Sequence, residues 1–242
     1  MGAGDLKRVD QLLAGFGYCS RRQAKAWVKA GRVVAGGETI QDVARRVDPN
    51  HTLVDGAPVP FPRGLLVAFH KPLGVVCSHS FDDGPRIYDL LPSPWLARKP
   101  PPATVGRLDK DTTGLILITD VGALIQGFTA PRRKVAKVYQ VTVDRPLDPP
   151  LSAIFAAGEL LLQGEKTPCA PADLVITGLC QGQLTLFEGR YRQVRRMFAH
   201  FDYRVTALHR SHFGPYSLGD LAPGHHRPLT MPDSSLGIAP TG

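Results

Sequence analysis

The chain has 242 residues, 43% of them hydrophobic, which is enough for a large domain and a small one with buried cores. Its four cysteines lie far apart with no Cys-x-x-Cys pair, which argues against a zinc site and a disulfide framework. No apolar run approaches the ~18 residues of a membrane span, and residues 1–8 lack the apolar core of a signal peptide. We therefore expect a cytoplasmic protein without membrane association, and a net charge of +8 makes nucleic acid the leading candidate partner.

The first predicted element is an amphipathic helix that ends at Gly17. Its apolar residues recur at the spacing of one helical face: Val9, Leu12, Leu13 and Phe16. A second helix follows, because Ser20 and Gln23 can form a capping box and Gly31 supplies a C-terminal stop. Its buried side is predicted to carry Ala24, Trp27 and Val28.

The other side of the second helix is basic. Five cations repeat there at helical spacing with few carboxylates nearby: Arg21, Arg22, Lys25, Lys29 and Arg32. A solvated helix face is the alternative interpretation. The excess of one sign of charge favours contact with phosphates.

Short β-rich pieces separated by Gly-Gly, Pro-Asn and Asp-Gly turns follow over residues 31–59, and we expect a few short strands there. The stretch VDQLLAGFGYCSRRQAKAWVKAGRVVAGG, which starts at Val9, and the later VDG closely resemble the S4 RNA-binding domain. This resemblance implies that the two helices present their basic face to folded RNA.

A proline-rich stretch, GAPVPFPRG at residues 56–64, has the composition of an interdomain linker. We therefore expect a small domain over residues 1–60 and a larger one over 64–231. The remaining residues, 232–242, lack periodicity and large side chains, so we expect a disordered tail. A second proline-rich stretch at 91–105 is expected to be a surface loop.

The larger domain begins with LLVAFHKPLGVVCS, which predicts a strand, a tight turn at residues 71–74 and a second strand. The motif GRLDKDTTGLILITD follows at residues 106–120. Its run GLILIT predicts a strand covered on both faces, and Asp109 lies in the loop before it. A carboxylate so close to a core is costly to desolvate, so we expect a cation to face it. The alternative is a local ion pair with Arg107 or Lys110 that merely finishes a turn.

Two later segments supply further polar groups. AKVYQVTV, residues 136–143, alternates as a half-buried strand and places Tyr139 on the face opposite Val138 and Gln140. QLTLFEGRYRQVRRMFAHF predicts a strand, a turn at Gly189 and a helix whose apolar stripe is Val194, Met197, Phe198 and Phe201. Arginines flank that stripe at positions 192, 195 and 196. A loop carboxylate, a strand tyrosine and a helix arginine are thus available to one cleft.

Together, GRLDKDTTGLILIT, KVYQVTV, EGRYRQVRRMFAHF and VTALHRSHFG resemble the pseudouridine synthases, in the branch that carries an S4 domain and acts on ribosomal RNA. The resemblance runs nearly from end to end, and its most specific positions are Gly106, Arg107, Leu108, Asp109, Thr112 and Gly114. HKPLGVVCS, EKTPCAPADL and LAPGHHRPLT agree, and the last looks most like the small-subunit branch. The implied fold is α+β, with a mixed, largely antiparallel catalytic sheet beside the S4 module.

By this resemblance Asp109 is the catalytic nucleophile, Tyr139 stacks on the target base, and Arg195 pairs with Asp109. Arg107, Leu108 and Leu208 are expected to line the substrate pocket. RNA contacts are expected from the basic face of the S4 module and from Lys71, Arg192 and Arg196.

The implied reaction isomerises one uridine to pseudouridine. The expected substrate is 16S ribosomal RNA within an assembly intermediate of the small subunit. No cofactor is expected, because nothing is gained or lost in an isomerisation, and we expect a monomer. The rival hypotheses are a 23S ribosomal RNA synthase, a noncatalytic RNA-binding or ribosome-assembly factor, and an N-ribosyl hydrolase that would release uracil.

Two other candidate sites rank lower. The spacing of His209 and His212 and the pair His225 and His226 could suggest a metal. His209 and His212 lie in a predicted strand, however, where three-residue spacing points them to opposite faces, so no metal site is expected. Asp111 could join Asp109 as a second acid or base, but two positions along a loop do not fix the separation that such a mechanism needs. We interpret Asp111 as structural support.

Overall fold

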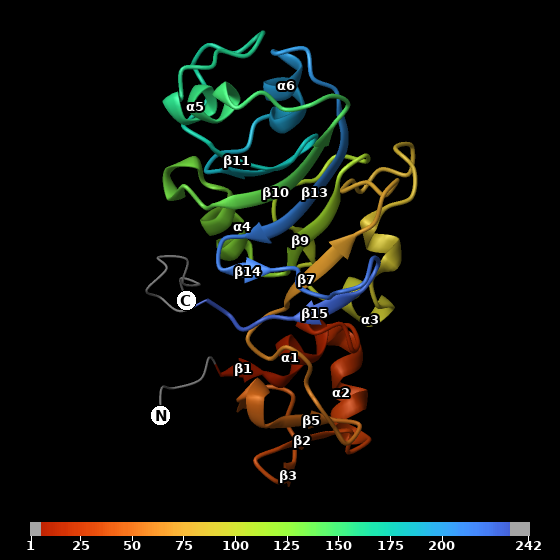
Figure 1. The fold of residues 1–242 in the computed structure, drawn as a ribbon. Coiled ribbons are helices and arrows are strands. Elements are labelled where there is room, and N and C mark those ends of the chain that lie inside the picture. The colour runs from red at the N-terminus through yellow and green to blue at the C-terminus, as the bar shows by residue number, and fades with distance from the viewer. Residues whose placement is uncertain (1–5, 233–242) are drawn as a thin grey trace. The chain divides into compact units, whose positions relative to one another are not determined.

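The computed structural model describes residues 6–232, and the chain forms two units (Figure 1). The first unit contains the segment up to Leu66 together with residues 91–103 and 118–122, and the rest of the chain forms the second unit. The predicted boundaries, 1–60 and 64–231, did not include these two later segments in the first unit. The predicted tail lies, except for Pro232, outside the described residues.

The first unit contains helices α1 (Val9–Gly15), α2 (Arg21–Lys29) and α3 (Ser93–Leu96), and strands β1 (Lys7–Arg8), β2 (Val33–Ala35), β3 (Glu38–Thr39), β4 (Arg46–Val47), β5 (Thr52–Val54) and β6 (Ala57–Pro58). Strands β3, β2, β5 and β6 form a small antiparallel sheet in that order, which confirms the predicted short strands. The core between α1, α2 and this sheet contains Val9, Leu12, Leu13, Ala24, Val28, Val33 and Ile40.

Both predicted helix boundaries of the S4-like region are confirmed. Gly17 ends the first helix with φ of 82°, and a Cβ atom there would lie 2.8 Å from the backbone carbon of Ala97. At the start of α2, the Ser20 hydroxyl accepts from the Gln23 amide at 3.3 Å, and the Gln23 side chain accepts from the Ser20 amide at 3.0 Å. A capping box of this kind stabilises a helix by roughly 1 kcal/mol.

The proline-rich stretch that was predicted as a linker is held by a buried ion pair. Arg98, 4% exposed, donates from Nε to the Asp120 carboxylate at 2.6 Å, and its other nitrogens donate to the carbonyls of Pro60 and Phe61. The second Asp120 oxygen accepts from the Leu65 amide at 2.6 Å. Residues from three separate segments of the first unit are therefore fixed by one guanidinium and one carboxylate.

The second unit is built on a large mixed sheet. Its strands run in the order β11, β12, β10, β13, β9, β7 and β15, with β14 paired to β13 and β8 to β9. Their bounds are β7 Leu66–Lys71, β8 Ala103–Thr104, β9 Thr113–Thr119, β10 Lys137–Val143, β11 Asp173–Gly178, β12 Gln181–Leu186, β13 Val205–Phe213, β14 Tyr216–Ser217 and β15 His226–Pro228. Strand β9 runs parallel to β13, whereas β10 pairs antiparallel with β12 and β13.

Helices α4 (Gly122–Thr129), α5 (Pro150–Ala157) and α6 (Gln193–Ala199) complete this unit, with α5 packed on β11 and α6 on β13. The apolar strand β9 is buried from Gly114 to Thr119, as its continuous hydrophobic run predicted. Figure 1 shows β10, β13 and β9 crossing the middle of the unit.

Two local predictions were wrong. The segment after residues 71–74 is not a strand, because Val76 makes only an isolated bridge to Arg86 in its own following loop. Phe201 also lies beyond the end of α6 at Ala199, in the turn before β13, although its ring still packs near Phe155. In both places the apolar residue is used for packing by a loop, which local periodicity does not distinguish from a regular element. No helix among residues 6–232 is long and apolar enough to cross a membrane.

Candidate active site

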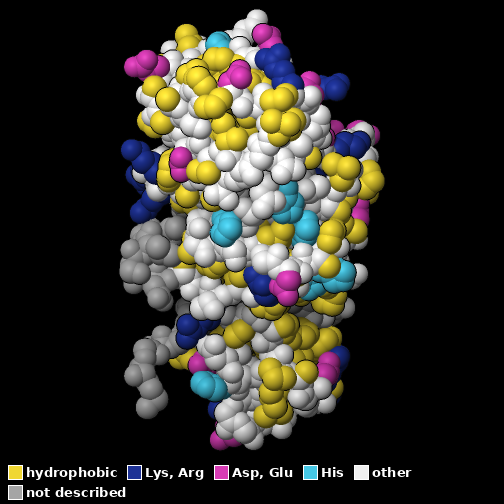
Figure 2. Space-filling view, viewed as in Figure 1, with side chains coloured by type: hydrophobic (Ala, Val, Ile, Leu, Met, Phe, Trp, Pro, Cys, Tyr) yellow, Lys and Arg dark blue, Asp and Glu magenta, His cyan; other side chains and the backbone are white. Residues whose placement is uncertain are grey.

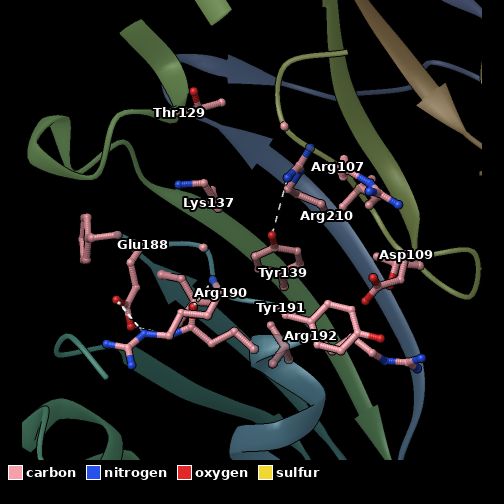
Figure 3. A pocket seen from close by; sticks show the side chains of 18 of the residues that line it. Arg107, Asp109, Thr129, Lys137, Tyr139, Glu188, Arg190, Tyr191, Arg192 and Arg210 are labelled. Carbon is pink, nitrogen blue, oxygen red and sulfur yellow. Dashed lines mark hydrogen bonds and ion pairs between the residues drawn. The ribbon is translucent and has the colours of Figure 1, made fainter. Parts of the chain in front are cut away.

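A cavity of about 730 Å³ opens in the second unit (Figure 3). Its wall is formed by the loop before β9, the segment that leads from α4 into β10, the turn between β12 and α6, and strand β13. The sequence-predicted residues that line it are Arg107, Leu108, Asp109, Tyr139, Arg192, Arg195 and Leu208. The structure thus brings together side chains that lie up to a hundred positions apart in the sequence.

The loop that carries Asp109 is fixed at both ends. The Thr112 amide donates to the Asp109 carbonyl at 3.0 Å, which closes a turn, and the Lys110 carbonyl accepts from the Gly74 amide at 2.9 Å. Immediately after this turn, Gly114 pairs with Arg210 of β13, so the start of β9 lies against the neighbouring strand. The position of Asp109 in the cavity is therefore set by the pairing of β9 with β13.

The predicted ion pair between Asp109 and Arg195 is not formed. Arg195 instead donates from Nη2 to the carbonyl of Asp111 at 2.9 Å and to its carboxylate at 3.1 Å, and from Nη1 to the Val205 carbonyl at 2.8 Å. Arg192 binds the same carboxylate of Asp111 at 2.9 Å. Asp111, two positions after Asp109, thus supports the loop structurally, as predicted, because it binds both Arg192 and Arg195.

The Asp109 carboxylate itself makes no hydrogen bond or ion pair with any residue in the described range 6–232. The local ion pair considered as an alternative is also absent there, because the Lys110 ammonium donates to the Asp83 carbonyl at 3.2 Å. Asp109 is half-buried and lines the cavity, so its oxygens are available to a bound molecule. A carboxylate placed in this way can act as a nucleophile.

Lys71 does not lie on an RNA-binding surface, and the structure contradicts that prediction. Its side chain is fully buried, and its ammonium donates to the carbonyls of Val75 at 2.6 Å and Pro72 at 3.0 Å. Burial lowers the pKa of Lys71, while the nearby acidic groups of Cys77, Asp111 and Asp109 act in the opposite direction when they are ionised. Lys71 is therefore an internal cation within electrostatic range of the carboxylate loop.

Tyr139 lies deep in the cavity, with 9% of its surface exposed. Its hydroxyl accepts from Nη1 of Arg210 at 3.5 Å (Figure 3). Arg210 is 2% exposed, donates from Nε to the Leu115 carbonyl at 2.7 Å and lies over the Phe213 ring. The arginine has no carboxylate partner among residues 6–232, so the inner wall of the cavity carries an uncompensated positive charge next to Tyr139.

Lys137 adds a second cation to this wall. Burial, followed by the charge of Arg210, lowers the pKa of Lys137 to about 8, and its ammonium donates to the Val135 carbonyl at 2.9 Å. Glu188 and Arg190 line the same cavity, and the two form an ion pair at 3.1 Å. The cavity is therefore predominantly cationic, as a site for a segment of nucleic acid requires.

The cations that were predicted to contact RNA differ in whether their side chains already form ion pairs within the protein. Arg196 is engaged within the protein, since it donates to the Glu165 carboxylate at 2.7 Å and to the Gln163 carbonyl at 2.7 Å. Arg32 forms a two-point ion pair with Asp55 at 2.6 Å and lies 3.3 Å from the centre of the Trp27 ring. The four cations of α2 are exposed and have no ion pair within the described chain: Arg21, Arg22, Lys25 and Lys29.

Sequence reasoning missed several residues of the site. Arg210, Lys137 and Tyr191 line the cavity although none was predicted to. A further group lies beside the cavity-lining residues Pro131 and Val135, where the side chains of three consecutive exposed cations make no hydrogen bond or ion pair within the part of the chain that the structure describes: Arg132, Arg133 and Lys134. The run Arg-Arg-Lys lies just before the strand that carries Tyr139, and this position in the sequence could have indicated that the three cations lie near the site.

The histidines that were considered as metal ligands have other partners. His209 bonds through Nδ1 with the Thr113 hydroxyl at 2.9 Å, and its ring lies 5.4 Å from that of His70. Burial, and then the neighbouring His70, lower the pKa of His209, which keeps the ring neutral at pH 7. Histidine side chains gather near the centre of the face in Figure 2. Among residues 6–232, no three His, Cys, Asp or Glu residues group as a metal site.

Comparisons with known proteins agree with this arrangement. Residues 65–168 match the RNA pseudouridylate synthase family, and residues 7–53 match the S4 domain. Ribosomal small subunit pseudouridine synthase A of Salmonella typhimurium is 39% identical over 226 residues, which cover 92% of this chain and 96% of that protein. The protein of the same name from Yersinia pestis is 38% identical over 238 residues, or 96% and 99% of the two chains.

A crystal structure of a pseudouridylate synthase covers 96% of this chain and 98% of that one, with a TM-score of 0.65 and 35% sequence identity. The fold is therefore that of an RNA pseudouridine synthase. The chain belongs to the S4-domain-containing pseudouridine synthase family that includes ribosomal small subunit pseudouridine synthase A. The predicted α+β fold with a mixed, largely antiparallel sheet and the predicted enzyme class are confirmed.

Proposed function

We propose that this enzyme converts one uridine of the 16S ribosomal RNA of the small subunit to pseudouridine. The relatives named for the small ribosomal subunit match nearly the whole chain, and this supports the substrate. The observation that carries the chemistry is the half-buried, unpaired carboxylate of Asp109 in a cationic cavity that also contains Tyr139.

In the proposed reaction the target uridine leaves its stack and enters the cavity, because its reacting atoms are inaccessible inside a helix. Asp109 acts as the nucleophile, on the sugar or on the uracil ring, and the bond that its carboxylate oxygen forms is broken again before the product leaves. The bond between C1′ and N1 breaks, the uracil rotates, and a bond forms between C1′ and C5, from which a proton is lost while N1 gains one. Atoms and electrons balance within the nucleotide, so no cofactor is required.

Tyr139 is proposed to stack on the flipped uracil, since its ring is held at the inner wall of the cavity by the strand pairing of β10. Leu108 and Leu208 would form apolar walls beside it, and Arg107, which is exposed in the same loop, would meet the phosphates. Arg195 acts as a positioning residue, because its two bonds to Asp111 hold the loop that carries Asp109.

The exposed cations of α2 are proposed to bind the RNA backbone, together with Arg192 at the cavity. We propose that the active form is a monomer. Sequence-specific readout of RNA usually requires unpaired bases, so the substrate is proposed to be an assembly intermediate in which the target loop is open. Such a substrate implies a cytoplasmic location.

The substrate is tested by deleting the gene and mapping pseudouridine across both ribosomal RNAs. The expected result is the loss of one 16S site, which the parent gene restores. Loss of a 23S site with all 16S sites intact would refute the 16S assignment and favour the 23S alternative. Product analysis of RNA treated with the pure protein separates the other rivals: free uracil would indicate a hydrolase, and unchanged uridine a noncatalytic factor.

A further inference from the structure

Tyr191 is an aromatic side chain of the cavity to which the proposed mechanism gives no role. Tyr191, in the turn between β12 and α6, lines the cavity, yet it is 77% exposed. Its side chain makes no hydrogen bond or ring contact within residues 6–232. Figure 3 shows its ring extending into the same space as Tyr139 and Asp109. An aromatic ring that is open to solvent at such a cavity offers a face on which a nucleic-acid base can stack.

The backbone that presents this ring is tightly held. The Tyr191 carbonyl accepts from Nη1 of Arg196 at 3.1 Å, and the Arg190 amide donates to the Gln193 side chain at 3.0 Å. Arg192, the next residue, has φ of 46°, a left-handed conformation that is unfavourable for a residue other than glycine. The turn is therefore fixed in an unfavourable conformation that holds Tyr191 outward.

The exposures of the two tyrosines assign them different positions along the RNA. Tyr139 is 9% exposed at the inner wall, where the flipped uracil must reach the Asp109 carboxylate. Tyr191, at 77%, lines the part of the cavity that is open to solvent. Arg192, whose side chain is 40% exposed, lies beside it and adds a positive charge for the RNA backbone.

We propose that Tyr191 stacks on the base of a nucleotide adjacent to the target uridine. This inference rests on the proposed function and extends it to a second subsite. Flipping removes the target from its stack and leaves a neighbouring base with one uncovered face, and an aromatic side chain can cover that face. Because every base has such a face, Tyr191 contributes affinity and register with little preference for the identity of the neighbour.

The experiment is a cycle of protein and RNA changes. Binding is measured in the Asp109→Asn background, and turnover in the parent background, with an RNA fragment that contains the target. The fragment is used intact or with an abasic site on the 5′ or the 3′ side of the target. Tyr191→Ala removes the ring, and Tyr191→Phe retains it. Leu179→Ala is the matched control, because Leu179 is 75% exposed in the turn between β11 and β12 and does not line the cavity.

Tyr191→Ala is expected to weaken binding of the intact RNA by roughly 5- to 100-fold, with KM raised by a similar factor and kcat nearly unchanged. Tyr191→Phe and Leu179→Ala should resemble the parent. An abasic site on one side should weaken binding to the parent by the same factor and cause no further loss with Tyr191→Ala, because both changes remove one contact.

The inference would be overturned if the abasic site weakened binding equally in the parent and in Tyr191→Ala, whether it lies on the 5′ or the 3′ side of the target. Unchanged binding of the intact RNA by Tyr191→Ala would also overturn it. A Tyr191→Ala defect confined to kcat would also overturn it, since it would place the ring on the target base. Failure of the proposed function is distinguishable, because the parent would then form no pseudouridine while the binding cycle could still be completed.

Discussion

Replacement of Gly114 by alanine tests how the sheet positions the catalytic loop. Gly114 has φ of 107°, and a Cβ atom built there would lie 2.3 Å from the carbonyl oxygen and 2.7 Å from the amide nitrogen of Arg210. These are backbone atoms of β13, which cannot rotate away as a flexible side chain would. Alanine therefore requires the start of β9 to separate from β13.

The cost can be estimated from two terms. The strained backbone conformation contributes about 1–3 kcal/mol, and overpacking against a rigid neighbour adds about 1–3 kcal/mol. We expect Gly114→Ala to lower the free energy of unfolding by about 2–6 kcal/mol, which corresponds to a fall of roughly 4–24 °C in Tm. Because Asp109 lies five positions earlier, a displacement of about 1 Å should also lower kcat/KM by roughly 100-fold.

The assay is thermal and urea unfolding followed by far-UV circular dichroism, together with pseudouridine formation below the transition. Gly122→Ala is the matched control, because Gly122 begins α4 and no atom lies within 4 Å of the position that its Cβ atom would take. It should be neutral or slightly stabilising. A Gly114→Ala protein within about 1 kcal/mol of the parent and fully active would refute the reasoning that the β9–β13 contact sets the loop.

Three further predictions concern the rest of the molecule. Arg98→Met leaves the Asp120 carboxylate buried without its partner and should destabilise the first unit by about 3–5 kcal/mol. Trp27 and Trp95, both in that unit, report this loss by fluorescence, and an unchanged transition would contradict it. Replacing the four exposed cations of α2, namely Arg21, Arg22, Lys25 and Lys29, with alanine should weaken RNA binding and reduce the slope of log K against log salt by about 3; an unchanged slope would show a solvated face. The pKa of Lys137, about 8 in the folded protein, lies below its ordinary value, so between pH 8 and about 10.5 the unfolded chain binds more protons. Stability from this group should therefore rise with pH across that window, and Lys137→Met should lack the rise in urea titrations; the same pH profile in both proteins would contradict the assignment.

Local sequence signals predicted the elements that depend on neighbours in the chain. The capping box of Ser20 and Gln23 and the buried strand β9 formed as expected, because capping and burial patterns act within a few residues. The motif around Asp109 also predicted the loop at the cavity. The residues that carry the resemblance were thus sufficient to locate the candidate nucleophile, although its catalytic role stays a prediction.

Partners across the fold could not be read in the same way. Arg195 was predicted to pair with Asp109, and Lys71 was predicted to contact RNA. In the structure Arg195 instead binds Asp111, and Lys71 is buried and donates to backbone carbonyls. Arg210 was missed because a charged residue in a strand carries no sign that its neighbours will bury it. Which cation faces which carboxylate depends on strand register, and a single sequence does not specify register over long separations.

The decisive measurement for the proposed chemistry is pseudouridine formation by purified Asp109→Asn enzyme on the 16S target RNA. The variant preserves side-chain volume and removes the nucleophilic carboxylate. Asp173→Asn is the control, because Asp173 is exposed on β11 and does not line the cavity. We expect the parent and Asp173→Asn to form pseudouridine, whereas Asp109→Asn forms none although it binds the RNA with a Kd close to that of the parent. Measurable turnover by Asp109→Asn would contradict the assignment of Asp109 as the nucleophile.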